Sequence, residues 1–108
     1  MYPSIVADIG GTNARFALVS GRANDQFTFS DIHILSAGSY PSFTDALRAY
    51  IAMVPGLQPK AGCAASAGPV VGDKVRMTNL NWAFSCKAVA EEFGLSRFIA
   101  MNDFAAVA

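Results

Sequence analysis

The sequence predicts an α/β domain, built on a mixed sheet of five to six strands with flanking helices. Three observations support this prediction. Short apolar runs rich in β-branched residues open the chain and recur later, two segments carry apolar residues at helical spacing, and turn and capping residues separate the segments. The predicted order is βββαββαβα, in which hairpin strands come first and helical crossover connections then lead to further strands.

The first three predicted elements are strands. SIVADI (4–9) is short and apolar, and NARFALVS (13–20) follows it after two glycines, so we expect these segments to pair as a hairpin. GRAND (21–25) has the composition of a turn. QFTFSDIHILS (26–36) predicts a third strand with one apolar face. The side chains expected on that face are Phe27, Phe29, Ile32 and Ile34.

The segment SYPSFTDALRAYIAMV (39–54) is the first predicted helix. Ser42 or Thr44 can cap its beginning, and Pro55-Gly56 ends it. Apolar side chains at spacings of three and four predict one buried face. They are Phe43, Leu47, Tyr50, Ile51 and Val54.

The second half of the chain alternates strands and helices. AGCAASAG (61–68) predicts a strand of small residues, KVRMT (74–78) predicts another strand, and NLNWAFS (79–85) is expected to be a loop. Ser85 is expected to cap a helix over CKAVAEEF (86–93), which Gly94 ends. The last predicted strand and helix are RFIAM (97–101) and NDFAAVA (102–108).

The final predicted helix has no capping residue at its end. We therefore expect residues 1–108 to form the N-terminal domain of a longer protein. The apolar fraction of 53% fits a well-filled core, and it equally fits a domain with one face against further protein.

Charge and composition argue against several classes of partner. The chain has 8 Lys and Arg against 8 Asp and Glu, without a basic run, which disfavours nucleic acid and anionic membrane as main partners. The N-terminus does not resemble a signal peptide, and no apolar run is long enough to span a membrane. Cys63 and Cys86 are expected to be reduced thiols, so we expect a cytoplasmic protein.

The stretch ADIGGTN (7–13) carries the first candidate site. Glycines allow positive φ and remove Cβ, so a phosphate can reach backbone N–H groups, to which Thr12 and Asn13 add neutral donors. Asp8 is expected to hold Mg²⁺ beside the phosphates. The turn thus suits a magnesium nucleotide, although a plain hairpin turn is an equally good interpretation.

Two further stretches contain candidate substrate-binding residues. In MNDF (101–104), Asp103 could accept a hydroxyl proton and Asn102 could position the same substrate, although either residue could simply cap a helix. In MTNLNWAFS (77–85), amide groups that include Asn79 surround Trp82, a mixture that suits sugars. The alternative is that Trp82 fills the core.

Taken together, ADIGGTNARFAL, GPVVGDKVRMTNLNWAF and MNDFAAVA resemble the bacterial-type glucokinase family of the sugar kinase/actin/Hsp70 superfamily. This resemblance implies a ribonuclease H-like domain, ATP as donor, and transfer of its γ-phosphoryl group to the 6-hydroxyl of glucose. It implies that residues 7–12 bind ATP with Asp8 near Mg²⁺, that Asn102 binds sugar, and that Asp103 is the catalytic base. The residues that the resemblance implies in ATP binding are Ala7, Asp8, Ile9, Gly10, Gly11 and Thr12. The chemistry of the turn adds Asn13.

The resemblance also implies that a second domain supplies the adenine-binding region and the rest of the sugar site. Residues 1–108 alone are therefore expected to be inactive and to self-associate as a homodimer. The alternatives are the nucleotide-binding half of an actin-like or Hsp70-like ATPase, and a kinase for another hexose. A folded interaction module is a third possibility.

Overall fold

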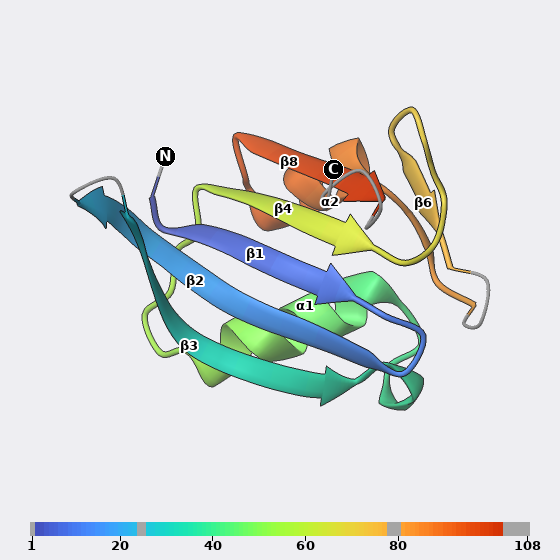
Figure 1. Cartoon of the computed structure of the whole chain (residues 1–108), viewed down its shortest axis with the longest axis horizontal. Helices are drawn as coiled ribbons and strands as arrows, with labels where there is room; N and C mark the ends of the chain where they lie inside the picture. The colour runs from blue at the N-terminus through green and yellow to red at the C-terminus, as the bar shows by residue number, and fades with distance from the viewer. Residues whose placement is uncertain (1, 24–25, 78–80, 103–108) are drawn as a thin grey trace.

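The main sheet of the computed structural model has five strands in the order β3-β2-β1-β4-β8 (Figure 1). The structure describes residues 2–23, 26–77 and 81–102. β1 pairs antiparallel with β2, and β2 pairs antiparallel with β3. β4 runs parallel to β1, and β8 runs parallel to β4. The predicted mixed sheet is confirmed. Its strands are β1 (Ser4–Ile9), β2 (Asn13–Ala23), β3 (Gln26–Ser36), β4 (Ala61–Ser66) and β8 (Arg97–Asn102).

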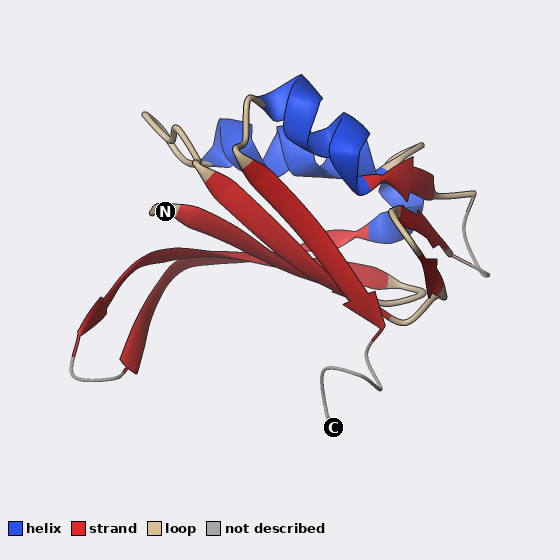
Figure 2. Cartoon of the chain, turned by 90° about the horizontal axis from the view of Figure 1, so that it is seen from above, coloured by secondary structure: helices blue, strands red, loops and turns tan. Residues whose placement is uncertain are grey.

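Two helices cover one face of this sheet (Figure 2). They are α1 (Phe43–Met53) and α2 (Cys86–Phe93), and a short 3-10 helix, η1 (Ala37–Ser39), precedes α1. The Ser42 hydroxyl accepts from the Asp45 N–H at 3.1 Å, so Ser42 rather than Thr44 is the cap. Ser85 caps α2 in the same way, and Gly94 ends it with a φ of 66°.

A second sheet of three short strands lies beyond the carboxyl ends of β4 and β8 (Figure 1). It consists of β5 (Val70–Val71), β6 (Lys74–Arg76) and β7 (Ala83–Ser85), in antiparallel pairs. The predicted strand over 74–78 therefore exists as a shorter strand, outside the main sheet. The prediction of a loop over 79–85 is wrong at Ala83–Ser85, because pairing with β6 extends this segment.

Two other predictions need correction. Gly21–Ala23 continue β2 rather than turning, because they pair with residues 26–28 of β3. Asn102 is the last residue of β8 and not the start of a helix. Residues 103–108 lie outside the described part of the chain, so the helix predicted there is not tested.

Aromatic side chains join the helices, the main sheet and the small sheet into one core. Phe43 of α1 stacks on Phe84 of β7 with ring centroids 4.3 Å apart, and it also contacts Phe98 of β8. Trp82 is buried, and its Nε1 donates to the Tyr40 carbonyl at 3.0 Å. Of the two interpretations of Trp82, a sugar-binding ring and a core-filling ring, the structure supports the second.

The face of the main sheet opposite the helices is exposed at β3. The four apolar side chains predicted to share a face are all more than half exposed there. They are Phe27, Phe29, Ile32 and Ile34. Among the described helices, none is long and apolar enough to cross a membrane.

Candidate functional site

The ends of three parallel strands bring the two main candidate stretches to one edge of the sheet. Ile9 at the end of β1 pairs with Ser66 at the end of β4, and Ser66 pairs with Asn102 at the end of β8. Ligands of open α/β sheets bind at the carboxyl ends of the strands. The Gly-Gly turn, which follows β1, and Asn102, which ends β8, therefore lie on either side of β4 at this edge of the sheet.

The turn after β1 leaves backbone donors available. The Gly10 N–H donates to the Asn13 carbonyl at 2.9 Å, and the Thr12 carbonyl accepts from the Ala37 N–H at 2.9 Å. Within the described part of the chain, the N–H groups of Gly11 and Thr12 have no hydrogen-bond acceptor. Two adjacent backbone N–H groups without acceptors can bind a phosphate oxygen.

A cavity of about 310 Å³ lies against this turn. Its lining combines the turn, one carboxylate, one guanidinium and one apolar side chain. The lining residues are Asp8, Gly10, Gly11, Thr12, Asn13, Arg15 and Ile34. Five of the seven residues predicted to bind nucleotide thus border one cavity, whereas the side chains of Ala7 and Ile9 are buried in the core. These two residues could contribute only through their backbone.

Steric requirements of the fold do not explain Gly10. The glycines with positive φ in the described chain are Gly56, Gly72 and Gly94, so Gly10 and Gly11 do not use the positive φ that glycine allows. A Cβ on Gly10 would meet the Asn13 carbonyl oxygen at 3.5 Å, which is an ordinary contact. The glycine leaves its backbone open to a ligand, which favours a binding turn over a plain hairpin turn.

Asn102 is held at the other side of the crevice by the chain that leaves β4. Its Nδ2 donates to the Gly68 carbonyl at 3.1 Å. The Gly68 N–H in turn donates to the buried Ser66 hydroxyl at 3.1 Å, and that hydroxyl donates to the Met77 sulfur at 3.2 Å. A Cβ on Gly68 would lie 2.3 Å from the Arg76 carbonyl oxygen, so only glycine fits. We call Ser66, Gly68, Met77 and Asn102 the junction.

Asp103 and Asn79, the predicted base and a predicted sugar-binding residue, lie outside the described residues. Asp103 directly follows Asn102, the last residue of β8. Among the described residues, no three His, Cys, Asp or Glu side chains come together. Within the described part of the chain, Asp8 would therefore need further ligands from a substrate, from water or from another part of the protein to hold a metal ion.

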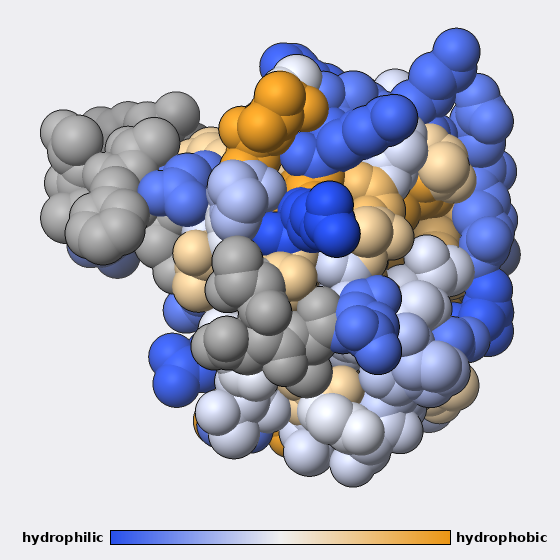
Figure 3. Space-filling model, turned by 90° about the vertical axis from the view of Figure 1, so that its right-hand side faces the viewer, coloured by the Kyte–Doolittle hydropathy of each residue, from blue (hydrophilic) through white to orange (hydrophobic). Residues whose placement is uncertain are grey.

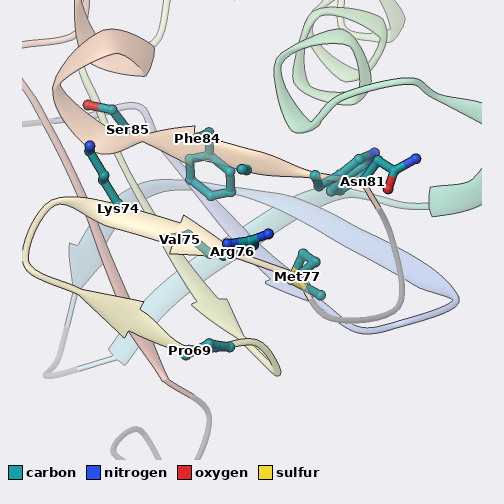
Figure 4. Close-up of a pocket in the computed structure, with 10 residues that line it drawn as sticks. Pro69, Lys74, Val75, Arg76, Met77, Asn81, Phe84 and Ser85 are labelled. Carbon is teal, nitrogen blue, oxygen red and sulfur yellow. The ribbon is translucent and has the colours of Figure 1, made fainter.

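A larger cavity of about 830 Å³ lies along the small sheet (Figure 4). β6 contributes Lys74 and Arg76, and the loop before β7 contributes Asn81. This end of the molecule is largely hydrophilic, with small hydrophobic patches (Figure 3). Asn81 is the second amide of the stretch MTNLNWAFS, and it borders this cavity rather than the turn after β1.

Hydrogen bonds to Asp73 connect the turn between β5 and β6 to the start of α2. Its carboxylate accepts from the Ser85 hydroxyl and, at 3.1 Å, from the Lys87 N–H. The Ser85 hydrogen bond, followed by the Lys87 N–H and nearby lysines, lowers the pKa of Asp73. Burial raises the pKa of the Cys63 and Cys86 thiols, so neither is a candidate nucleophile.

Sequence reasoning missed Arg15 as a site residue. Arg15 lies directly opposite Asp8 in the β1–β2 ladder, so both residues project from the same face of the sheet. The signal was present in the sequence, because Asn13 and Arg15 are two positions apart and so share a face of the strand after the turn.

Comparisons with known proteins agree on one family. A sequence model of the glucokinase family matches residues 5–108. Glucokinase of Saccharophagus degradans is 54% identical over the whole of this chain, and that of Chromohalobacter salexigens is 51% identical over 98% of it. The chain spans about a third of the length of these relatives, 34% and 32% respectively.

Solved structures show the same fold. A glucokinase from an Antarctic psychrotroph matches 98% of this chain and 34% of its own, with a TM-score of 0.92 and 38% identity. A ROK family glucokinase from Streptomyces griseus, in complex with glucose and AMPPNP, matches 94% of this chain and 33% of its own. At a TM-score of 0.68 and 23% identity, this second likeness concerns the fold alone.

Proposed function

The chain belongs to the glucokinase family, and we propose that it forms the N-terminal domain of a kinase that transfers the γ-phosphoryl group of ATP to the 6-hydroxyl of glucose. One observation supports this most directly: the register Ile9–Ser66–Asn102 places the Gly-Gly turn and the Asn102 stretch on either side of β4 at one edge of the sheet. A kinase must hold its phosphate donor next to the acceptor, and two sites on either side of one strand meet this requirement.

The domain proposal covers residues 1–108, with the remaining part of the enzyme supplied by a second, larger domain. The relatives that match the whole chain are about three times as long, since it covers 34% of the first of them. The strand order β3-β2-β1-β4-β8 supports the further proposal that the domain is ribonuclease H-like.

The donor side of the proposed site is the turn after β1. The N–H groups of Gly11 and Thr12 would bind phosphate oxygens, and the absence of Cβ at Gly10 lets the phosphates approach. Asp8 fits a magnesium ion, because Mg²⁺ in kinases is held by one or two carboxylates together with substrate phosphates. When bound, Mg²⁺ neutralises charge on the phosphate oxygens.

The acceptor side is the end of β8. The hydrogen bond from Asn102 Nδ2 to the Gly68 carbonyl orients the amide, which would contact sugar hydroxyls. Asp103, the next residue, would accept the proton of the 6-hydroxyl as it attacks the γ-phosphorus. Asn79 would add a further contact to sugar.

The enzyme is proposed to act in the cytoplasm, with neither nucleic acid nor membrane as partner, and residues 1–108 alone are proposed to self-associate as a homodimer. The balanced charge, with 8 basic and 8 acidic residues, supports the absence of nucleic acid and membrane as partners. Residues 1–108 alone would bring no second wall to the crevice, so we expect them to be inactive. Sedimentation of the 108-residue chain tests its self-association, and a coupled assay of the same chain tests the inactivity.

The decisive test is Asp103→Ala in the intact enzyme. We expect kcat for glucose phosphorylation to fall by orders of magnitude while the Kd for ATP changes little, because the base acts on the acceptor. Glu91→Ala, on the exposed side of α2, is the matched control and should retain wild-type kcat.

Two outcomes would contradict the proposal. A near-normal kcat for Asp103→Ala would remove Asp103 from the base role. An intact enzyme that hydrolyses ATP equally with and without glucose, and does not bind millimolar glucose in calorimetry, would instead be an ATPase of the actin-like or Hsp70-like kind.

A further inference from the structure

Ser66, the last residue of β4, is a buried polar residue between the two sides of the proposed site. Among the described serine, threonine, amide and charged residues, it is the one that is buried. In the register it pairs with Ile9 at the end of β1 and with Asn102 at the end of β8. A buried hydroxyl is tolerated when its hydrogen bonds are made within the protein, so its partners indicate its role.

Two hydrogen bonds hold the Ser66 hydroxyl in one orientation. It donates its proton to the Met77 sulfur at 3.2 Å, and its oxygen accepts from the Gly68 N–H at 3.1 Å. A hydroxyl has a single proton, so the bond to Met77 turns the lone pairs of the oxygen toward Gly68. Met77 is itself buried, and its N–H donates to the Trp82 carbonyl at 2.9 Å. The acceptor that Ser66 offers to Gly68 is therefore fixed by the packed fold.

The backbone at Gly68 is held from several directions. The Arg76 carbonyl oxygen occupies the space where a Cβ would lie, and the Arg76 N–H donates to the Pro69 carbonyl at 3.2 Å. Pro69 also restricts the backbone of the residue before it. Ser66 holds the remaining group, the Gly68 N–H. The Gly68 carbonyl consequently keeps one direction, in which it accepts from Asn102 Nδ2 at 3.1 Å.

This carbonyl decides the orientation of the Asn102 amide. The two ends of an asparagine side chain have similar shapes but opposite chemistry, since Nδ2 donates and Oδ1 accepts. A flip of the amide would place Oδ1 against the Gly68 carbonyl oxygen, and two acceptors repel each other. The amide therefore presents one fixed pattern of donor and acceptor at the end of β8. Recognition of a sugar hydroxyl needs such a fixed pattern, because a hydroxyl both donates and accepts.

We propose that Ser66 is a positioning residue for the acceptor sugar, and that it acts on glucose through Gly68 and Asn102. This inference rests on the proposed function and adds to it a buried residue that does not contact the substrate. Without the hydroxyl, the Gly68 N–H loses its acceptor inside the protein, and the backbone shifts to recover one. The Gly68 carbonyl and the Asn102 amide then adopt more than one orientation. Glucose must order them on binding, which lowers its affinity.

The test is steady-state kinetics of Ser66→Ala in the intact enzyme. The KM for glucose should rise about fivefold, the factor that one hydrogen bond of typical net strength provides, while the KM for ATP stays at the wild-type value. A merely structural role would change kcat or both KM values, not the KM for glucose alone. Val89→Ala, on the buried face of α2, is the control for lost stability and should leave both KM values unchanged. Thermal melting of each variant measures the stability that it has lost.

A double substitution tests the route through Asn102. If Ser66 acts by orienting Asn102, Ser66→Ala should not raise the KM for glucose any further once Asn102 is replaced by alanine. Effects of the two substitutions that multiply would overturn the inference, because Ser66 would then act by another route. Ser66→Cys keeps a side chain of similar size and a weak acceptor, so it should raise the KM for glucose less than Ser66→Ala does. If Ser66→Ala does not fold, a wild-type KM for glucose in Ser66→Cys would overturn the inference.

The outcomes separate this inference from the proposed function. A wild-type enzyme that neither phosphorylates nor binds glucose would refute the proposed function, and the inference with it, before any variant is made. A wild-type enzyme that phosphorylates glucose, together with an unchanged KM for glucose in Ser66→Ala, would refute the inference alone. Equal rises in the KM for glucose and the KM for ATP would also overturn it, because the substitution would then disturb both sides of the site.

Discussion

Two glycine-containing segments border the proposed crevice, and they differ in what makes glycine necessary. At the turn after β1, a Cβ on Gly10 would make an ordinary contact of 3.5 Å. At the junction after β4, a Cβ on Gly68 would lie 2.3 Å from the backbone oxygen of Arg76. The turn is also open to solvent and keeps two free N–H groups, whereas Gly68 is buried and hydrogen-bonded through both its N–H and its carbonyl.

This difference indicates how the two sides of the crevice are built. The junction is part of the packed fold, and it holds Asn102 as a consequence of that packing. The fold alone would accept a larger residue at Gly10, which supports the proposal that the turn binds a ligand. Substitutions at the junction should therefore change stability first, and substitutions at the turn should change ligand binding first.

Gly68→Ala should have the largest effect on stability. The added methyl group would overlap backbone rather than a movable side chain, so the chain at Gly68 or at the end of β6 must shift. Overpacking of this kind costs about 1–3 kcal/mol, and we expect the upper part of that range. The midpoint of thermal unfolding of the intact enzyme measures it. Gly38→Ala, where a Cβ would meet nothing within 4 Å, is the control, and equal midpoints for the two variants would refute the steric argument.

Asn102→Ala should have an intermediate effect on stability and a separate effect on sugar binding. It removes the hydrogen bond from Nδ2 to the Gly68 carbonyl, which is worth about 1 kcal/mol. It also removes the proposed contact to sugar, so the KM for glucose should rise about tenfold while the KM for ATP stays constant. A rise in the KM for ATP of the same size would mean that the residue acts through folding alone.

Gly10→Ala should have the smallest effect on stability and a clear effect on the nucleotide. The unfolding midpoint should match that of the wild type, since substitutions that meet only ordinary contacts outside the core stay within about 0.5 kcal/mol. The Kd for ATP should rise about tenfold, because the methyl group occupies the approach to the Gly11 and Thr12 N–H groups. Calorimetry with ATP measures this rise. Normal ATP binding together with a lower unfolding midpoint would place Gly10 among the structural glycines.

Local signals in the sequence predicted the helices well. Ser42 and Ser85 each accept a hydrogen bond from the backbone three residues on, and Gly94 adopts the left-handed conformation that ends α2. These features depend on neighbours in the chain, so residue type and spacing are enough to predict them. The five strands of the main sheet were also predicted, because each contains a short run of apolar or small residues.

The small sheet was predicted poorly because its strands are very short. β5, β6 and β7 contain two or three residues each, too few for a pattern of alternating side chains. Their pairing depends on contacts between distant segments, such as the stack of Phe84 on Phe43. The role of Trp82 was open for the same reason, since nothing near it in the sequence specifies that Tyr40 accepts its hydrogen bond.

For the site, the sequence by itself determined which residues carry suitable chemistry: an acidic residue and two glycines in a hairpin turn, and an Asn-Asp pair after a late strand. Only the tertiary structure decided that these stretches lie on either side of β4, that Gly68 and not Gly10 is required for packing, and that Arg15 faces the same cavity as Asp8. The physical reason is that strand order and register depend on pairing between segments far apart in the chain. Residue type, in contrast, is given directly by the sequence, and turn chemistry depends on neighbouring residues alone.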